Sequence, residues 1–218
     1  MIVYVESNFV LEIALSQEQA SYAESILSLA ESGKVSLAFP SFALSEPFAT
    51  ITYRRAKLTS LFNSLELTLE EMERSEPLKQ FVLNMRPLVT SLKGAQRRDF
   101  DALPLTIERM LAAGRAIETD LSGFKEALGY QASLDLSPQD SIIYATVLHD
   151  LRSRPDEEIK CFLSRDKRAF LDEGNLSARY GDRDKLGSRR TINAQLKKYG
   201  CRYISSFDDG LNFIKRFA

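Results

Sequence analysis

The sequence has few of the residues that specify disulfide or zinc sites. It contains two cysteines, Cys161 and Cys201, so a disulfide framework is excluded. Both lie in apolar runs, where core packing in a reducing cytosol is expected. The single histidine, His149, has no partner cluster, which argues against a His/Cys zinc site. Seven prolines and ten glycines give no low-complexity signal.

Charge and hydropathy exclude further classes of protein. The formal net charge of -1 excludes a globally basic nucleic-acid binder, although a local basic face remains compatible with it. No apolar run approaches the roughly 20 residues of a membrane span. The opening MIVYVESNFVLEIAL lacks the basic start of a secretory leader and reaches Glu6 at once. We therefore expect a cytoplasmic protein with no membrane partner. Its 218 residues, 44% of them hydrophobic, suit one domain spanning 1–218.

Short apolar segments alternate with helical ones at both ends of the chain. The expected strands are 2–5, 35–39, 159–163 and 201–204. The first expected helix is capped by Ser7 or Asn8 and ends at 15, and the last is capped by Ser205 or Ser206. Between them, helices are expected at 18–31, from about 45 to 57, and at 137–151, 165–171 and 189–199. This alternation predicts an α/β fold, a three-layer sandwich around a central, mainly parallel sheet.

The middle of the chain has a different pattern. From 58 to 130 it shows helical periodicity and no convincing strand, which predicts a helical insertion within the single domain. Breaks are expected at Gly94 and at 99–104, and 175–187 is expected to be irregular. One helical stripe of the insertion consists of Leu78, Phe81, Val82, Met85, Leu88, Val89 and Leu92.

Four acidic residues fall where a parallel sheet would bring them together. Glu6 directly follows the first strand and Asp166 follows the third, and the carboxyl ends of parallel strands share one edge. Asp140 stands three residues before Ile143, on the apolar stripe of its helix. Glu46 has helical spacing to three apolar neighbours, which are Phe42, Ala49 and Tyr53.

Clustered carboxylates repel one another and raise one another's pKa unless a cation compensates their charge. An all-oxygen ligand set selects Mg²⁺ or Mn²⁺ over Zn²⁺. Taken singly, each acid is more often an ordinary helix cap than a ligand, and Asp140 alone is about evenly balanced. The joint placement of all four therefore favours a divalent-metal site.

The order of the segments IVYVESNFVLEI, FPSFALSEPFA, LSPQDSIIYATVL and CFLSRDKRAF resembles the PIN-domain family of metal-dependent nucleases, which includes the toxins of VapBC systems. The resemblance covers roughly the first third and the last two fifths of the chain. It implies a PIN-like sandwich in which Glu6, Glu46, Asp140 and Asp166 bind Mg²⁺ or Mn²⁺ and hydrolyse RNA phosphodiesters. It also implies that Ser7, Asn8 and Ser164 orient these ligands.

The sequence departs from the family pattern at three places, and two of them, Glu6 and the missing Asp-Phe, favour an alternative function. The first acid is usually Asp, whereas here it is Glu6, and Pro47 directly follows the second acid. The Asp-Phe that often follows the fourth acid is replaced by Ala169 and Phe170. The alternative is a catalytically impaired PIN-like module that binds RNA or protein.

Basic residues are concentrated beside the proposed site. From 160 to 202 there are twelve Lys or Arg and five Asp or Glu, which suits phosphate contact or an ordinary solvated surface. The candidate RNA-binding residues are Arg165, Lys167, Arg168, Arg189 and Arg190. Further partners implied by the family resemblance are an antitoxin and a second copy of the chain.

Overall fold

The computed structural model describes residues 1–170 and 183–217, without the side chains of Gln96, 167–168 and 183–190. Its centre is a five-stranded sheet, ordered β3-β2-β1-β4-β5, in which every neighbouring pair is parallel. The strands are β1 (Ile2–Val5), β2 (Ser36–Pro40), β3 (Gly114–Ile117), β4 (Lys160–Leu163) and β5 (Cys201–Ile204). All four residues of the central β1 are buried, as predicted for a strand that is covered on both faces.

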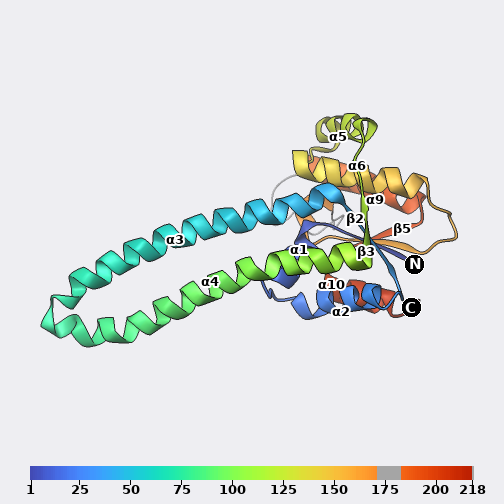
Figure 1. The fold of residues 1–218 in the computed structure, drawn as a ribbon. Helices are drawn as coiled ribbons and strands as arrows, with labels where there is room; N and C mark the ends of the chain where they lie inside the picture. Colours follow the sequence, from blue (N-terminus) through green and yellow to red (C-terminus); the bar gives the residue numbers. More distant parts are fainter. Residues whose placement is uncertain (171–182, 218) are drawn as a thin grey trace.

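Helices cover both faces of the sheet, so the chain is a mixed α/β protein with three layers (Figure 1). Val3 and Val5 point to one face, while Ile2 and Tyr4 point to the other, following the two-residue period of a strand. The first face packs against α1 (Ser7–Ala14), α2 (Ala20–Glu31) and α10 (Phe207–Ile214). The second packs against α5 (Leu121–Leu134), α6 (Pro138–Arg152) and α9 (Arg183–Lys198).

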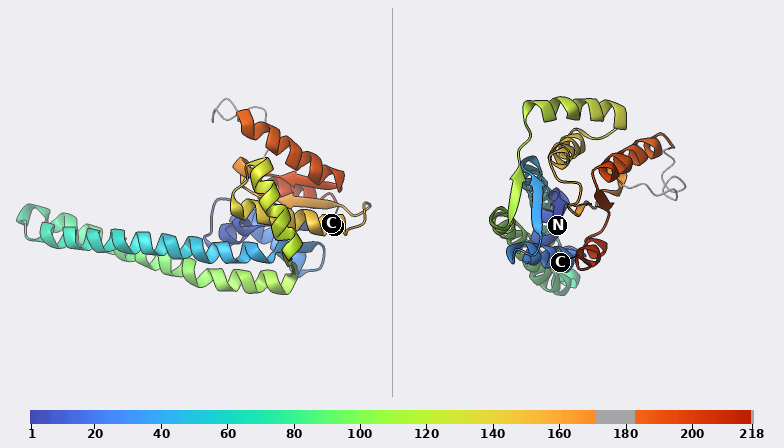
Figure 2. Two further views of the ribbon diagram at one scale, coloured as in Figure 1. Left: turned by 90° about the horizontal axis from the view of Figure 1, so that it is seen from above. Right: turned by 90° about the vertical axis from the view of Figure 1, so that its right-hand side faces the viewer.

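Two long helices leave this body as a hairpin. After the short helix η1 (Ser41–Leu44), α3 (Ser45–Glu73) runs outward, turns at η2 (Glu76–Leu78) and returns as α4 (Lys79–Ala113). The hairpin projects well beyond the sheet (Figure 1, Figure 2). Its outer part has its own small core, which consists of Phe62, Leu69, Val82 and Val89.

The expectation that 58–130 contains no strand is wrong. β3 lies inside that range and pairs with β2 as an edge strand of the sheet. Its sequence, Gly-Arg-Ala-Ile, has one buried residue, Ile117, so no apolar run or alternation marks it. The helical periodicity of α4 also continues up to the first residue of β3, so the sequence pattern does not mark the boundary between them.

The expected breaks at Gly94 and 99–104 are also wrong, because α4 is continuous through both, with Pro87 and Pro104 inside it. A proline inside a helix costs roughly 3 kcal/mol, but contacts along α3 and the body give this helix stability beyond its intrinsic propensity. The segment expected to be irregular is partly helical, since 183–187 opens α9, and 175–182 lies outside the described residues.

A buried ionic network joins β3, β1 and α6. The carboxylate of Asp150 accepts two hydrogen bonds from Arg115 (2.9 and 2.7 Å), two from Arg154 (3.1 and 3.2 Å) and one from the hydroxyl of Tyr4 (2.7 Å). Burial alone would raise the pKa of Asp150, but these donors outweigh it and lower the pKa to about 2. The network therefore anchors the edge strand that the sequence pattern does not reveal.

We expect Asp150→Ala to lower the free energy of unfolding by about 3 kcal/mol, because it leaves the buried Tyr4 hydroxyl and two guanidinium groups without their acceptor. Urea unfolding followed by circular dichroism measures this change. The control is Asp156→Ala, an exposed aspartate in the next loop, which should change stability by less than about 0.5 kcal/mol. Equal effects of the two variants would contradict an anchoring role.

Candidate functional site

The four acids predicted as ligands all come from elements that begin or end at the carboxyl edge of the sheet. Glu6 directly follows β1, and Glu46 lies in the first turn of α3, which begins soon after β2. Asp140 lies in the first turn of α6, and Asp166 follows β4 and precedes α7 (Lys167–Phe170). The expected convergence towards one edge is therefore present in the chain topology.

Glu6 is buried and begins α1. It is the N-cap of that helix in place of the predicted Ser7 or Asn8, because its Oε2 accepts a hydrogen bond from the backbone N–H of Asn8 at 3.1 Å. Its Oε1 accepts from Asn8 Nδ2 at 2.7 Å. Burial raises the pKa of Glu6 to about 7, although hydrogen bonds from Asn8, Ser7 and Ser164 act in the opposite direction.

A single hydroxyl connects Glu6 to Glu46. Ser7 Oγ lies 2.8 Å from Glu6 Oε2 and 2.7 Å from Glu46 Oε2. A hydroxyl has one proton, so it cannot donate to two ionised carboxylates at once. A protonated Glu6 resolves the conflict by donating to Ser7, which then donates to Glu46. The raised pKa of Glu6 agrees with this arrangement.

Asp140 experiences the field of two other acids. Burial is the largest cause that raises its pKa to about 6, and the negative charges of Asp166 and Glu46 raise it further. Its Oδ2 accepts a hydrogen bond from Ser137 Oγ at 2.6 Å, which acts in the opposite direction. Ser137 also caps α6 by accepting from the N–H of Asp140, so the predicted start of this helix is confirmed.

Asp166 is held beside a second serine. The N–H of Asp166 donates to Ser164 Oγ at 3.0 Å, and its own Oδ1 accepts from the N–H of Ala169 at 3.0 Å, at the start of α7. The side chain of the buried Ser164 also acts to lower the pKa of Glu6, and the Ser164 carbonyl accepts from the hydroxyl of Tyr203 at 2.9 Å. Ser164 therefore connects the end of β4 to the end of β1.

The environment of Glu46 differs from the prediction. Its expected apolar neighbours on α3 do not form a buried stripe, because Ala49 and Tyr53 are exposed. Pro47 occupies the first turn of α3, where a missing N–H is tolerated, so it does not prevent a helical Glu46. Half-buried Glu46 therefore belongs to the site through its contact with Ser7 and its influence on Asp140.

The partners of Glu6 distinguish it from two other buried acids in the described structure. Asp150 is paired with two arginines, and Glu12 accepts from Arg165 at 2.5 Å. The partners that the structure gives Glu6 are hydroxyl and amide groups. Burying a carboxylate without a cation is costly, so Glu6 is where a bound cation would relieve the largest penalty.

The oxygen-only donor set suits a hard divalent cation, but the side chains do not form a closed cage. Within residues 1–170 and 183–217, no three His, Cys, Asp or Glu side chains gather closely enough to hold a metal ion as they stand. Glu6 and Glu46 are joined through Ser7, while Asp140 interacts electrostatically with Asp166 and Glu46. At this edge, Glu6 and Glu46 are thus linked through a hydroxyl, and Asp140 is linked to Asp166 and Glu46 through electrostatic repulsion.

The predicted RNA-binding residues are only partly described. Arg165 forms ion pairs with Glu12 and Glu18, so it holds α1 and the following turn against the end of β4. The side chains of the other four, Lys167, Arg168, Arg189 and Arg190, lie outside the described residues. The partner Glu12 was missed from sequence, although an acid inside the apolar run FVLEIAL is a signal of a buried pair.

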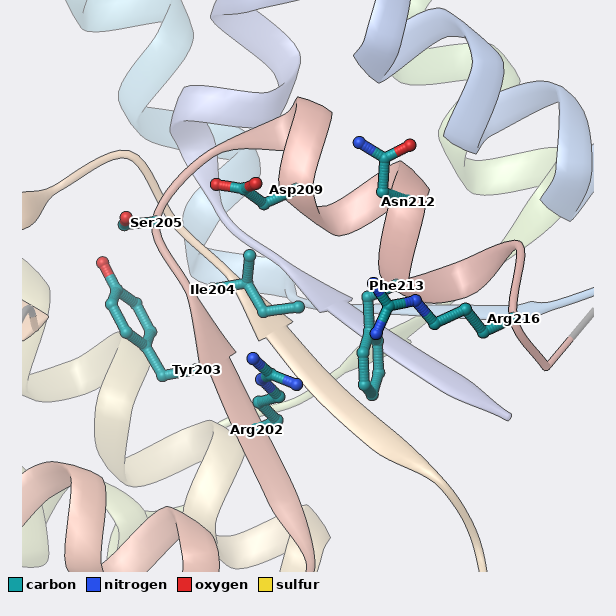
Figure 3. Close-up of a pocket in the computed structure, with 8 residues that line it drawn as sticks. All are labelled: Arg202, Tyr203, Ile204, Ser205, Asp209, Asn212, Phe213 and Arg216. Carbon is teal, nitrogen blue, oxygen red and sulfur yellow. The ribbon is translucent and has the colours of Figure 1, made fainter.

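A shallow pocket of about 610 Å³ lies beside the same edge, between β5 and α10 (Figure 3). Ser205 and Asp209 line one end, and Arg202 and Arg216 line the other, where Arg202 stacks 5.2 Å from the ring centre of Phe213. Tyr203 lines the pocket and also contacts Ser164, which connects the pocket wall to the acidic site.

No protein-family model, curated protein or solved structure matches this chain. Within the described residues, no helix has the length and hydropathy needed to cross a bilayer. The functional argument therefore depends on the chemistry of the site.

We expect Glu6→Gln to stabilise the protein at pH 8 in EDTA by on the order of 2 kcal/mol, since glutamine resembles the protonated acid. The pKa of Glu6 is raised to about 7, so its stabilising proton is fully bound below its ordinary pKa of 4.5 and is lost as the pH rises through 7. Urea unfolding between pH 5 and 8 should show a smaller decline for the variant than for the wild type.

The control for this prediction is Glu12→Gln, which alters another buried glutamate nearby. Because Glu12 is paired with Arg165, its neutralisation should lower stability at pH 8. If Glu6→Gln also lowered stability at pH 8, the inference that Glu6 is an uncompensated buried acid would be wrong.

Proposed function

We propose that this protein is a metal-dependent nuclease, and specifically an endoribonuclease with a PIN-like fold. The observation that supports it most is the grouping of acids from four separate elements at one sheet edge. Two of them contact the same serine hydroxyl, and a third has its pKa raised by two other carboxylates. Such a group gains most from a divalent cation.

Glu6, Glu46, Asp140 and Asp166 would hold Mg²⁺ or Mn²⁺, directly or through water. A bound ion of this kind lowers the pKa of a coordinated water and neutralises charge on a phosphodiester. The side chains around the site would position the carboxylates. Ser7, Asn8 and Ser164 fix the carboxylate of Glu6, and Ser137 fixes that of Asp140.

The raised pKa values give the site a pH-dependent charge. Near pH 6 Asp140 is partly protonated and Glu6 mostly so, and both ionise as the pH rises past about 7. The site therefore acquires its full negative charge in the neutral range, and cation binding should strengthen there. Ser7 can then donate its proton to either glutamate.

The alternative, a catalytically impaired PIN-like module that binds RNA or protein, is favoured by one observation. Asp166 caps α7 and Glu6 caps α1, so both acids already have structural roles without a metal. An antitoxin partner and toxin activity would follow from the PIN-like proposal and have no separate support in the geometry.

Activity provides the first test. The protein should cleave single-stranded RNA with Mn²⁺, lose cleavage in EDTA, and lose on the order of 100-fold or more in rate on Asp140→Asn. Gel analysis of a labelled RNA measures this. Cleavage that persists in EDTA, or in the Asp140→Asn variant, would refute the mechanism.

The control is Asp209→Asn on α10. Ser206 and Asp209 repeat the local cap of Ser137 and Asp140, with the hydroxyl 2.7 Å from the carboxylate and an N–H donor at 3.1 Å. The two substitutions therefore disturb equivalent caps, and only Asp140 lies in the field of Glu46 and Asp166. Asp209→Asn should leave the cleavage rate within about twofold.

Cation binding separates the two candidate functions. A nuclease site should raise the melting temperature with Mn²⁺, by mass action corresponding to about 2.7 kcal/mol at one hundred times Kd, and Asp140→Asn should abolish the gain. Thermal denaturation with and without Mn²⁺ at pH 7.5 measures it. The absence of a shift in the wild type would favour the impaired module.

A further inference from the structure

The outer part of the α3–α4 hairpin carries large apolar side chains that are exposed to solvent. Leu61 on α3 and Phe81 and Leu88 on α4 are each about half exposed or more. They lie in the part of the hairpin that projects beyond the sheet. They therefore cannot be explained as core residues of the α/β body.

The exposed residues of both helices project to the same side of the hairpin. On α3 the exposed Leu61 immediately precedes the buried Phe62, and on α4 the exposed Leu88 immediately precedes the buried Val89. The buried residues Phe62, Leu69, Val82 and Val89 form the seam between the two helices. Each step of one residue rotates the side chain by about 100° around the helix axis. Because the helices are antiparallel, the residues that directly precede a seam residue on either helix lie on the same side of the hairpin. This apolar side consists of Leu58, Leu61, Phe81, Leu88 and Leu92.

The opposite side of the hairpin carries its ion pairs. Arg86 contacts Glu73 and Lys93 contacts Glu66, both at 2.5 Å. Each of these charged residues stands four positions after a buried one, which turns it to the other side of the seam. The polar residues at helical spacing on the apolar side are Ser64, Thr68, Asn84 and Ser91, with the exposed Glu71 at its outer margin.

The apolar stripe of α4 is wider than one neighbouring helix requires. The same three positions are apolar in two successive seven-residue repeats, first Phe81, Val82 and Met85, then Leu88, Val89 and Leu92, while Leu83 lies outside this stripe. A stripe of this width is typical of a helix that packs between two neighbours in a bundle, whereas a two-helix seam needs two positions per repeat. In this hairpin α4 has one such neighbour, α3.

We propose that the apolar side binds the same side of a second copy of the chain, so that two hairpins form a four-helix bundle. The net charges of the helices agree with a second copy as the occupant. Residues 58–73 of α3 include four acidic and no basic side chains, while 79–98 of α4 include five basic and no acidic ones. A two-fold rotation sets each acidic α3 beside a basic α4, so the net charges of neighbouring helices are opposite in sign, while the ion pairs within each hairpin stay on the other side, away from the contact.

The size of the surface also suits a dimer. The outer hairpin that carries the apolar side is roughly 22 Å long, from the rise per residue over 58–73 of α3, and about 20 Å wide, from the diameter of two helices. Two such faces bury on the order of 1,000 Å², the lower bound for a specific interface. Pairing α3 with α4 further requires the hairpins to point the same way with their tips together, since the reverse arrangement places α3 over α3.

The test is the mass of the full chain in solution, measured by light scattering after size exclusion. The wild type should be a dimer at tens of micromolar, and Leu88→Glu should raise the dimer Kd by at least about 10-fold. Leu61→Glu, on the other helix of the same side, should have the same effect. A monomeric wild type would overturn the proposal and would indicate a different partner.

The matched control is Leu83→Glu, which lies on the same helix but on the opposite side of the seam. The two leucines have similar exposure, 51% for Leu88 and 57% for Leu83, so both substitutions affect folding and solubility alike. Leu83→Glu should remain dimeric. Equal dissociation of the Leu83 and Leu88 variants would exclude the apolar side as the interface. The measurement does not depend on nuclease activity.

The direction of the hairpins has its own measurement. A Ser75→Cys variant places a thiol at each tip, while the native Cys161 and Cys201 are buried. If the hairpins point the same way, a short bis-maleimide should link the two copies efficiently. A dimer that dissociates on Leu88→Glu but is not linked through Ser75→Cys would rule out the same-direction arrangement.

Discussion

The hydrogen bonding of the Ser7 hydroxyl to both Glu6 and Glu46 is the interaction on which the acidic edge depends. It joins the end of β1 to the start of α3, which stand 39 residues apart in the chain. Glu6 at the same time caps α1, and Ser164 connects it to the end of β4. The exits of two central strands and the starts of two helices are therefore positioned around one buried carboxylate.

The partners of the buried acids explain why this edge, and not another part of the described structure, is the candidate site. Asp150 and Glu12 receive arginine partners, which compensate their charge inside the folded chain. Glu6 receives hydroxyl and amide donors, and its pKa rises with burial. A fold that leaves such a group uncompensated loses stability at neutral pH, and the cation-binding role proposed for this edge would account for that loss.

The two sides of the hairpin also differ in whether their side chains have partners within the chain. Its ion pairs occupy one side, and the exposed side chains of Leu58, Leu61, Phe81, Leu88 and Leu92 occupy the other. Each of the four buried residues is followed four positions later by a charged one, and three of them, Phe62, Val82 and Val89, are preceded by an exposed apolar one. The acidic edge and the apolar side are thus separate surfaces with different chemical requirements.

The sequence by itself determined the elements with strong local signals. The buried strands β1, β2, β4 and β5 have apolar runs, and the caps at Ser137 and Ser206 are recognisable because their hydroxyls act within a few residues. Placing Glu6, Glu46, Asp140 and Asp166 at one edge followed from the rule that parallel strands share their carboxyl ends. Only the tertiary structure decided β3, the continuity of α4, the arginine partners of Glu12 and Asp150, and the contact of the Ser7 hydroxyl with both Glu6 and Glu46. These features arise from contacts between residues far apart in the chain, and a local sequence pattern carries no information on which distant group will supply a partner.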